Sequence, residues 1–380
     1  MRRLLMMGAP AWVLPGASAD IDFTHGRAWA LGNTGLSSLI STSRASSGYA
    51  QTAAGLWISF GSGIPRVTDQ GFLIEQAGTN LALWCRDFTN ANWTKSNVTA
   101  AKDQTGIDGA ANSASSLTAT ANNGTATAAA ITSASASRTV SMFVKRITGS
   151  GAVSISHDGG TTFTAITSKL GSSWYRPTPT DFAGLTQTVT NPQIVIKLGT
   201  SGDKIAVDFV QLEAGAFQTS PIATTNASVT RAADVITLTG QALMAALAAK
   251  AARFVTNGVV GGVGPRLVGN NDGSNSVLYN GSTQAIIVIG GLTKVTANFS
   301  SGSTAGLAKV AAGFDAAGTS LLVNGSAKAT NATTWPGFGS SAYLGNYSGG
   351  DRALNGYMLR ATFGLTKGMF DNLTIGDNPL

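Results

Sequence analysis

The sequence predicts an all-β protein made of two β-sandwich domains that follow an extended N-terminal arm. From Gly71 onward, short runs of alternating apolar and polar residues are separated by clusters of Gly, Asn, Asp and Ser, which is typical of sandwich strands and their turns. A helical period of apolar residues occurs in one segment only. The 380 residues suffice for about two domains at ~150 residues each. We therefore expect an arm over 1–70, a first sandwich over 71–235 and a second over 236–380.

The chain opens with MRRLLMMGAPAWVLPGASAD, which allows two interpretations. Two arginines, an apolar run and the small residues at 16–19 are typical of a cleaved secretory signal. Gly8, Pro10 and Pro15 interrupt the apolar run, however, and proline breaks a helix that would insert into a membrane. We favour the second interpretation, a docking arm that buries apolar side chains against a partner: Leu4, Leu5, Met6, Met7, Trp12 and Val13.

The remainder of the arm is rich in Gly and Ser and contains large aromatic side chains with no helical or strand period. Such side chains need burial. Because this segment has little regular structure of its own, we expect these aromatic side chains to pack on another domain or another chain.

The first sandwich is predicted from alternation within its strands. In 138–146 alternate residues from Val140 onward face the core, and in 204–213 the expected core face includes Phe209 and, after a shift, Leu212. The stretch 99–137 consists mostly of small and polar residues and is expected to form exposed strands and loops. Strands are expected near 72–75, 82–86, 138–146, 152–157, 163–168, 174–178, 193–198 and 204–213.

The second sandwich begins with the one helical segment, QALMAALAAKAAR, for which we predict about three turns over 241–253. Asn324 and Gly325 form a two-residue hairpin signal. Strands are expected near 254–259, 266–268, 276–279, 285–289, 308–314, 320–323, 342–344 and 356–364.

Charge and composition argue against several classes of protein. Charged residues make up 11% of the chain, the formal charge is +7, and the 25 Lys and Arg are scattered, with no basic run beyond Arg2-Arg3 and Lys145-Arg146. Nucleic-acid binding requires clustered positive charge, so we expect none. No apolar run reaches the ~18 residues of a membrane span. The single cysteine, Cys85, excludes an intrachain disulfide and is expected to be a buried apolar residue.

The sequence favours a protein without enzymatic activity. Glutamate occurs only at Glu75 and Glu213, and histidine only at His25 and His157. A glycosidase needs two carboxylates that flank the scissile bond, and no E-x-D-x-x-E pattern is present. A G-x-S-x-G nucleophile elbow is also missing from the sequence.

Four residues are candidates for saccharide binding. Trp174 and Tyr175 lie in SSWYRP at the start of an expected strand, where they are either core residues of the sandwich or platforms for stacking a sugar ring. Tyr347 and Asp351 lie in the Gly-rich loop NYSGGDR, and recognition residues are common in loops on a rigid scaffold.

Carboxylates and loop oxygens give candidates for a metal site. Asp208 and Glu213 lie on the expected last strand of the first sandwich, and their oxygens could hold a structural calcium ion. Five positions apart, they point to opposite faces of an ideal strand, so solvated carboxylates are the alternative. The loop GNNDGSN contains Asn270, Asn271 and Asp272, which either form a turn or hold a metal.

The segment GFLIEQAGTNLALWCRDFTNANWT, at residues 71–94, resembles a segment of virion proteins from tailed phages, prophages and gene transfer agents. The matching residues are Leu73, Ile74, Glu75, Thr79, Asn80, Leu81, Asp87, Phe88, Asn90 and Trp93. The segment VQLEAGAFQTSPIATTNASVTRAADV, which contains Arg231, resembles the end of the first sandwich in those proteins. The resemblance covers about residues 20–235 and implies a fibre, head-spike or tail-associated protein with a carbohydrate-module-like jelly roll. Glu75 and Arg231 belong to these motifs, and we expect them in an ion pair or interface.

The last part of the chain resembles the laminin-G-like or concanavalin-A-like sandwich. The matching marks are an Asn-Gly hairpin, a Leu-Gly-Asn strand at 344–346 and a Leu-Asn-Gly at 354–356. The sugar and calcium residues of true lectins are not recognisable here.

Together these features imply a structural component of a phage-like virion, assembled in the host cytoplasm and anchored by the arm to other virion proteins. We expect a homo-oligomer, a trimer or pentamer, that could bind bacterial surface polysaccharide. No cofactor is expected beyond the structural calcium. The alternative is a secreted bacterial glycan-binding protein, similar to a lectin, with a cleaved signal peptide.

Overall fold

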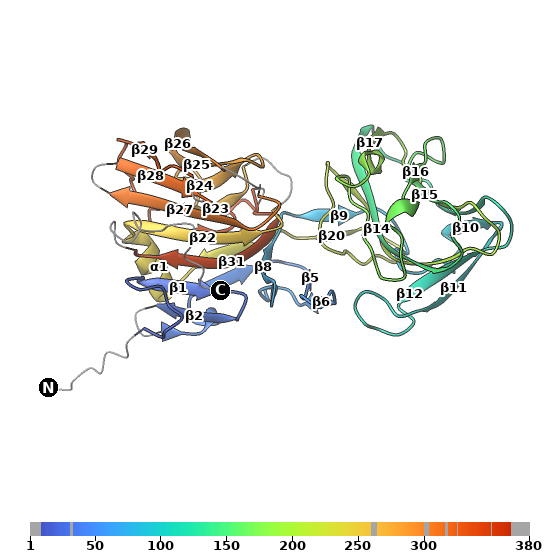
Figure 1. The fold of residues 1–380 in the computed structure, drawn as a ribbon, viewed down its shortest axis with the longest axis horizontal. Coiled ribbons are helices and arrows are strands. Elements are labelled where there is room, and N and C mark those ends of the chain that lie inside the picture. Colours follow the sequence, from blue (N-terminus) through green and yellow to red (C-terminus); the bar gives the residue numbers. More distant parts are fainter. Residues whose placement is uncertain are drawn as a thin grey trace. The chain divides into compact units, whose positions relative to one another are not determined.

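The computed structural model describes residues 9–30, 33–259, 264–299, 304–315, 318–324, 326–350 and 352–365. It confirms the all-β class, because the regular structure consists almost entirely of antiparallel strands in several sheets (Figure 1). No helix among these residues is long and apolar enough to cross a membrane. The chain divides into two compact units. Unit 1 contains the described residues of Met1–Ala53, Phe60–Ala77 and Ala232–Leu380, and unit 2 contains Ala54–Ser59 and Gly78–Arg231.

Unit 1 contains two large antiparallel sheets. The first has the order β29 (Ala329–Asn331), β28 (Gly318–Val323), β27 (Ala308–Asp315), β22 (Ala251–Asn257), β31 (Gly356–Phe363), β1 (Ala19–Asp22), β2 (Arg27–Ala30) and β3 (Asn33–Thr34), and β8 (Gly71–Ile74) pairs with both β31 and β7 (Val67–Thr68). The second has the order β26 (Leu292–Asn298), β25 (Gln284–Ile289), β24 (Ser276–Asn280), β23 (Arg266–Gly269), β30 (Tyr343–Leu344), β21 (Val235–Leu238) and β4 (Ile40–Ser43). The chain also forms β5 (Gly48–Gln51), β6 (Trp57–Phe60) and a 3-10 turn, η1 (Leu36–Ser38).

The two sheets of unit 1 enclose one apolar core, which makes the unit a sandwich. Phe254 and Phe363 from the first sheet meet edge to face, with ring centroids 5.8 Å apart. Tyr279 from the second sheet lies in the same core, and its hydroxyl is 2.7 Å from the Thr256 hydroxyl of the first sheet. All four residues are fully buried, so this bond satisfies two polar groups inside the core.

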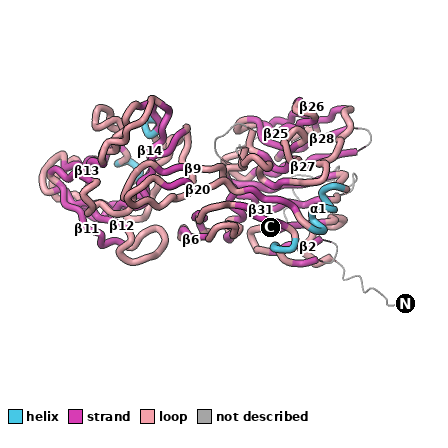
Figure 2. Tube along the Cα trace, turned by 180° about the vertical axis from the view of Figure 1, so that it is seen from behind, coloured by secondary structure: helices cyan, strands magenta, loops and turns pink. Residues whose placement is uncertain are grey.

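The helix predicted over 241–253 is shorter in the structure. α1 (Gly240–Leu247) ends within the alanine-rich segment and packs beside β1, β2 and β31 (Figure 2). The residues from Ala251 onward instead form β22, which lies between β27 and β31. Ala251 and Phe254 are fully buried there, so sheet pairing overrides the helical preference of the alanines.

Most of the described residues of the expected arm belong to the second sandwich, because their strands complete both sheets of unit 1, whereas Ala54–Ser59 belong to unit 2. β1 pairs with β31, and β4 pairs with β21. The carboxylate of Asp20 in β1 is buried and accepts hydrogen bonds from Arg360 Nε and Thr362 Oγ1, each at 2.9 Å. Phe23 packs on Phe72 with ring centroids 5.4 Å apart. The observed division therefore differs from the expected boundary at residue 70, and the other boundary lies near residue 231.

A buried ion-pair cluster joins segments of unit 1 that are distant in sequence. Asp234 accepts from Arg44 Nη1 at 2.9 Å and from Arg66 Nη2 through its second oxygen. Arg66 Nη1 also donates to Glu75 Oε2 at 2.7 Å. The side chains of Arg44, Arg66 and Asp234 are fully buried. The sequence suggested an ion pair or interface for Glu75, and the structure places Glu75 in this ion pair.

Unit 2 is a sandwich of two five-stranded antiparallel sheets. One has the order β10 (Trp93–Ser96), β13 (Gly124–Ala128), β18 (Val195–Leu198), β15 (Val153–Ser156) and β16 (Thr164–Ala165). The other has the order β11 (Val98–Gln104), β12 (Ala114–Ala119), β19 (Lys204–Ala214), β14 (Ala136–Thr148) and β17 (Thr186–Val189). A separate pair consists of β9 (Gly78–Asn80) and β20 (Val229–Arg231), and the 3-10 turns are η2 (Thr167–Lys169) and η3 (Ala183–Leu185). The strands expected near 82–86 and 174–178 are not formed, and these residues run as loops.

A β-bulge in β19 reverses the expected facing of several side chains. Ser141 of β14 pairs with Gln211 and Phe143 pairs with Asp208, so two residues of β19 lie opposite Met142 alone. Phe209, with φ of 43°, is one of these two, and it is absent from the core cluster where we expected it. Asp208 and Gln211 consequently lie on one face of the strand.

We expect Asp234→Asn to destabilise unit 1 by about 3–5 kcal/mol, because it leaves Arg44 and Arg66 buried without their shared carboxylate. The midpoint of the unit 1 transition in differential scanning calorimetry should fall by roughly 10 °C. The control is Asp272→Asn, a change of the same type in an exposed turn, which should leave this midpoint unchanged. An unchanged midpoint for Asp234→Asn would contradict the importance of the cluster.

Candidate functional site

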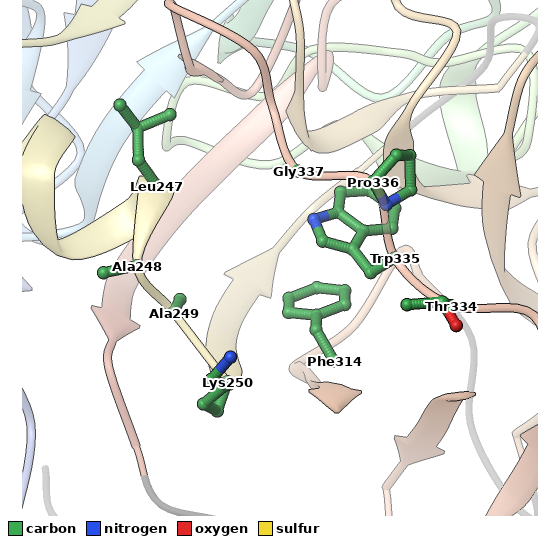
Figure 3. Close-up of a pocket in the computed structure, with 9 residues that line it drawn as sticks. All are labelled: Leu247, Ala248, Ala249, Lys250, Phe314, Thr334, Trp335, Pro336 and Gly337. Atoms are coloured by element: carbon green, nitrogen blue, oxygen red, sulfur yellow. The ribbon is translucent and has the colours of Figure 1, made fainter. Parts of the chain in front are cut away.

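A pocket of about 360 Å³ lies in unit 1, between the end of α1 and the loop that follows β29 (Figure 3). Residues 247–250 form one side, and Phe314 and residues 334–337 form the other. Its volume is within the range of about 300–1,000 Å³ that is usual for small-molecule sites. We therefore take this pocket as the candidate binding site.

One wall of the pocket is a fixed aromatic cluster. Phe314 stacks on Trp335, with ring centroids 4.6 Å apart and an angle of 29° between the rings. Phe338 meets Trp335 edge to face at 5.1 Å. Phe314 and Phe338 are buried, whereas Trp335 is half-buried. The buried rings thus hold the indole in place while part of it remains accessible.

The local sequence explains why Trp335 is presented in this way. Pro336 disfavours helical backbone at Trp335, the residue before it. Gly337 and Gly339 have φ of 90° and 71°, a region that other residues rarely adopt. The segment TTWPGFG therefore forms an irregular loop that places its tryptophan against Phe314.

Polar groups surround the aromatic wall. The indole nitrogen of Trp335 points toward the side formed by α1 (Figure 3), and it has no hydrogen-bond partner within the described residues. The end of a helix leaves its last carbonyl groups without intrahelical donors, and residues 247–249 provide such an end. Thr334 and the exposed Lys250 add a hydroxyl and an ammonium group. The pocket can thus contact an apolar surface and exchange hydrogen bonds with hydroxyl groups.

The sequence analysis did not identify this pocket. Its signal was a tryptophan in a loop of Thr, Pro and Gly, TTWPGFG, where a large aromatic side chain has no strand to support it. The sequence could not predict that Trp335 stacks on Phe314 and lines one pocket with the residues at the end of α1.

The structure places Trp174 and Tyr175 outside the apolar core of unit 2. Lys145 Nζ lies 4.7 Å from the centroid of the Trp174 ring, so a cation already covers this half-buried indole. Tyr175 exchanges two backbone hydrogen bonds with Val144, at 2.8 and 3.0 Å. Burial and the neighbouring carboxylate of Asp181 raise the pKa of the Tyr175 hydroxyl. Trp174 is therefore not a core residue, and its proposed contact with a sugar stays a prediction.

The two candidate loops of unit 1 meet in the structure. Ser348 Oγ donates to the backbone oxygen of Asn271 at 2.6 Å, and the Tyr343 hydroxyl donates to Asn271 Oδ1 at 3.0 Å. The guanidinium of Arg266 lies 4.5 Å from the centroid of the Tyr347 ring. Tyr347 is therefore covered on one face by a cation.

Of the two acidic residues in these loops, the structure describes Asp272 and not Asp351. The carboxylate of Asp272 accepts from the backbone nitrogen of Ser274 at 2.9 Å, which is the turn arrangement that we weighed against metal binding. Asn270 Oδ1 accepts from the backbone nitrogen of Asn275 at 3.0 Å in the same turn. Asp351 lies outside the described residues, so its proposed contact with a glycan stays a prediction.

Asp208 is held by an arginine. Arg86 donates to both of its oxygens, at 2.7 and 3.0 Å, and also to Asp108 at 2.7 Å. The backbone nitrogen of Ile107 donates to Asp208 Oδ2 at 3.0 Å. The Arg86 guanidinium also lies 4.1 Å from the centroid of the Phe209 ring, which explains where the bulged side chain packs.

Because of the bulge, Glu213 is buried on the same face of β19 as Asp208. On an ideal strand these two residues would point to opposite faces. Glu213 accepts from Thr219 Oγ1 at 2.6 Å, from the Thr219 backbone nitrogen at 3.0 Å and from Gln211 Nε2 at 2.8 Å. Within the described residues, no three His, Cys, Asp or Glu side chains are grouped so that they could hold a metal ion. The carboxylates of Asp208 and Glu213 are thus bound by protein donors.

The residues predicted to dock on a partner divide into two groups. Leu4, Leu5, Met6 and Met7 lie outside the described residues. Val13 is 5% exposed and packs within unit 1 against Ala251, Ala311 and Leu365. Trp12 lies at the edge of this cluster with Arg27 over its ring at 4.7 Å. The burial of Val13 is therefore accounted for by its own chain.

Other residues of the sequence motifs have structural roles. Asn80 Nδ2 donates to the backbone oxygens of Val210 and Ile222, at 3.0 and 2.9 Å. Trp93 stacks on Phe88 with ring centroids 4.1 Å apart in the core of unit 2. Cys85 is buried, as the sequence predicted, and Arg231 is buried in β20.

A scan of the chain against known protein families finds no match, and a search among curated proteins finds no relative. The fold and the pocket therefore supply the basis for assigning a function.

We expect a chelator to leave the thermal unfolding of unit 2 unchanged, because Arg86, Thr219 and Gln211 already occupy the oxygens of Asp208 and Glu213. The measurement is the unfolding midpoint with EDTA and with added calcium. A midpoint that rises with calcium, and that loses this rise in Asp208→Asn, would establish the structural calcium instead.

Glu213 should give unit 2 a stability that depends on pH. Burial raises the pKa of its carboxyl above the ordinary value of 4.5, so above that pH the unfolded chain releases a proton that the folded chain keeps. The stabilisation due to Glu213 therefore falls as the pH rises from 4.5 to its folded pKa. In thermal melts of Glu213→Gln and the parent protein, the difference in midpoint should shift in favour of the variant as the pH rises through this window. A difference that stays constant with pH would contradict the raised pKa.

Proposed function

We propose that this protein is a non-enzymatic structural component of a phage-like particle, a head spike, fibre or tail protein, and that it binds saccharides of a bacterial surface. The observation that carries this proposal is the aromatic pocket of unit 1. A sugar ring has apolar C–H surfaces and polar hydroxyl edges, and Trp335 beside the carbonyl groups that end α1 complements both.

The assignment to a particle rests on the resemblance at residues 71–94. The matching residues include Glu75, Asn80 and Trp93, which form buried contacts. They therefore support a shared architecture and not a shared ligand. A specific ligand must come from other parts of the chain, such as the loop of Trp335.

We infer that unit 2 is a jelly roll. Without the edge strands β10 and β11, the strands have the orders β12-β19-β14-β17 and β13-β18-β15-β16, and most connections between consecutive strands cross from one sheet to the other. This is the order that two Greek keys produce, and jelly rolls are found among capsid and lectin domains. Such a unit suits a particle protein as well as a glycan-binding one.

We further propose that several copies, three or five, act together on a particle with other virion proteins as partners. A single shallow saccharide site binds weakly, but linked sites increase the overall affinity by effective concentration. A closed ring of copies would provide those linked sites.

The packing of residues 12–17 favours this proposal over a secreted protein with a cleaved signal. Cleavage near the small residues at 16–19 would remove Val13 and expose the buried surface of Ala251 and Leu365. A retained segment avoids this exposure.

The experiment combines intact-mass spectrometry with sedimentation of the protein from its natural source. We expect a mass that includes residues 9–18, in a fraction of phage-sized particles. A second experiment uses a variant that lacks residues 2–8. This deletion removes Leu4, Leu5, Met6 and Met7 and leaves the cluster of Val13 intact. This variant should fold with an unchanged melting midpoint and fail to join particles. A mass that begins near Asp20 in a soluble fraction would overturn the particle assignment and support the secreted protein.

A further inference from the structure

We infer that the aromatic pocket of unit 1 selects an anionic sugar, a saccharide unit with one carboxylate such as a hexuronic acid, over its neutral counterpart. This inference rests on the proposed function and specifies the class of ligand. It assigns Lys250 as the residue that determines specificity.

The charge of the pocket is the first observation. Lys250 is the one ionisable residue among the nine that line the pocket. Among the described residues, the lining thus contains a cation and no carboxylate. A neutral sugar would leave this charge without a counterpart, whereas a carboxylate on the sugar ring would complement it.

The second observation is that Lys250 has no partner within the described part of the chain. Some other lysines have such a partner: Lys102 lies 3.5 Å from Asp87, and Lys145 lies over the ring of Trp174 at 4.7 Å. Lys250 forms neither kind of contact among the described residues, and its side chain is exposed. Its ammonium group is therefore available to a ligand without the loss of an existing ion pair.

The position of Lys250 relative to the aromatic wall fixes where the carboxylate would lie. The backbone oxygen of Lys250 accepts from the backbone nitrogen of Phe314 at 2.6 Å, so the two residues are held next to each other. Both border the pocket (Figure 3). A ring in contact with Phe314 and Trp335 would therefore place a carboxylate at its edge within reach of the flexible lysine side chain.

The partial charge at the end of α1 makes the positive charge of Lys250 more important for binding an anion. The C-terminus of a helix carries a partial negative charge, which disfavours an anion nearby. Lys250 follows the last helical residue, Leu247, by three positions and offsets that charge. Without the ammonium group, the pocket would have a slightly negative potential and would lose its preference for an acidic sugar.

The test measures binding of two oligosaccharides by isothermal titration calorimetry, one that contains glucuronic acid and the same oligosaccharide with glucose in its place. We expect the parent protein to bind the acidic sugar about threefold to fivefold more tightly at low salt, the range of a solvent-exposed ion pair. Lys250→Gln removes the charge but keeps a hydrogen-bond donor, so it should abolish this preference and make the two affinities equal. The matched control is Lys294→Gln, the same change on β26 outside the pocket, which should alter neither affinity.

Two further variants separate this inference from the proposed function. Ala248→Phe fills the pocket from an exposed position, and Trp335→Ala removes the wall, so both should abolish binding of either sugar. The melting midpoint shows whether each variant folds. If Trp335→Ala does not fold, Ala248→Phe alone tests the pocket.

The outcomes are distinct. If both sugars bind equally and Ala248→Phe abolishes binding, the selectivity for an anion is overturned and saccharide binding stands. If binding persists in Ala248→Phe, the pocket is not the site. If neither sugar binds while the protein still sediments with particles, the binding half of the proposed function and this inference both fail.

Discussion

The buried ion-pair cluster around Asp234 is the constraint on which the fold of unit 1 depends. The chain leaves this unit after Ala77 and returns at Ala232, so two segments of one sandwich are separated by the main segment of unit 2, Gly78–Arg231. Glu75 lies just before the departure and Asp234 just after the return, and their backbones are joined by a 2.9 Å hydrogen bond from Asp234 nitrogen to Glu75 oxygen. Arg66 binds both carboxylates. Charges in a low-dielectric core tolerate only a well-defined geometry, so the cluster fixes the register at which the two segments rejoin.

Alternation and turn residues in the sequence predict the class of fold, because they reflect local chemistry. The strands at 138–146 and 204–213 were predicted in this way, and they correspond to β14 and β19. The bulge at Phe209 could not be predicted, since it depends on the pairing of Met142 across the sheet and on Arg86, which is distant in the sequence. That one bulge decides that Asp208 and Glu213 share a face.

The same distinction applies to the N-terminal segment and to the candidate site. Apolar residues at 12–17 indicate burial, but nothing local shows that the surface they cover belongs to the same chain. Trp335 likewise lies in a loop whose importance comes from Phe314 and from the end of α1. Two of the four residues that the sequence offered for sugar binding, Trp174 and Tyr347, each have a cation over the ring. These contacts come from residues distant in the sequence, so the sequence alone could not predict them.

The pairing of β1 with β31 has a consequence for the order in which the protein can form on the ribosome. β1 is the first described strand and β31 is the last, and the ion pair of Asp20 with Arg360 spans 340 positions. Unit 2 is formed largely by one continuous segment, so nearly all of its strands have emerged while unit 1 still lacks its central strand. The early strands β1 and β8 must therefore wait, unpaired with β31, until translation has passed residue 363. During synthesis, the edges of β1 and β8 that later pair with β31 therefore stay open until the end of the chain, and unpaired strand edges favour association between chains.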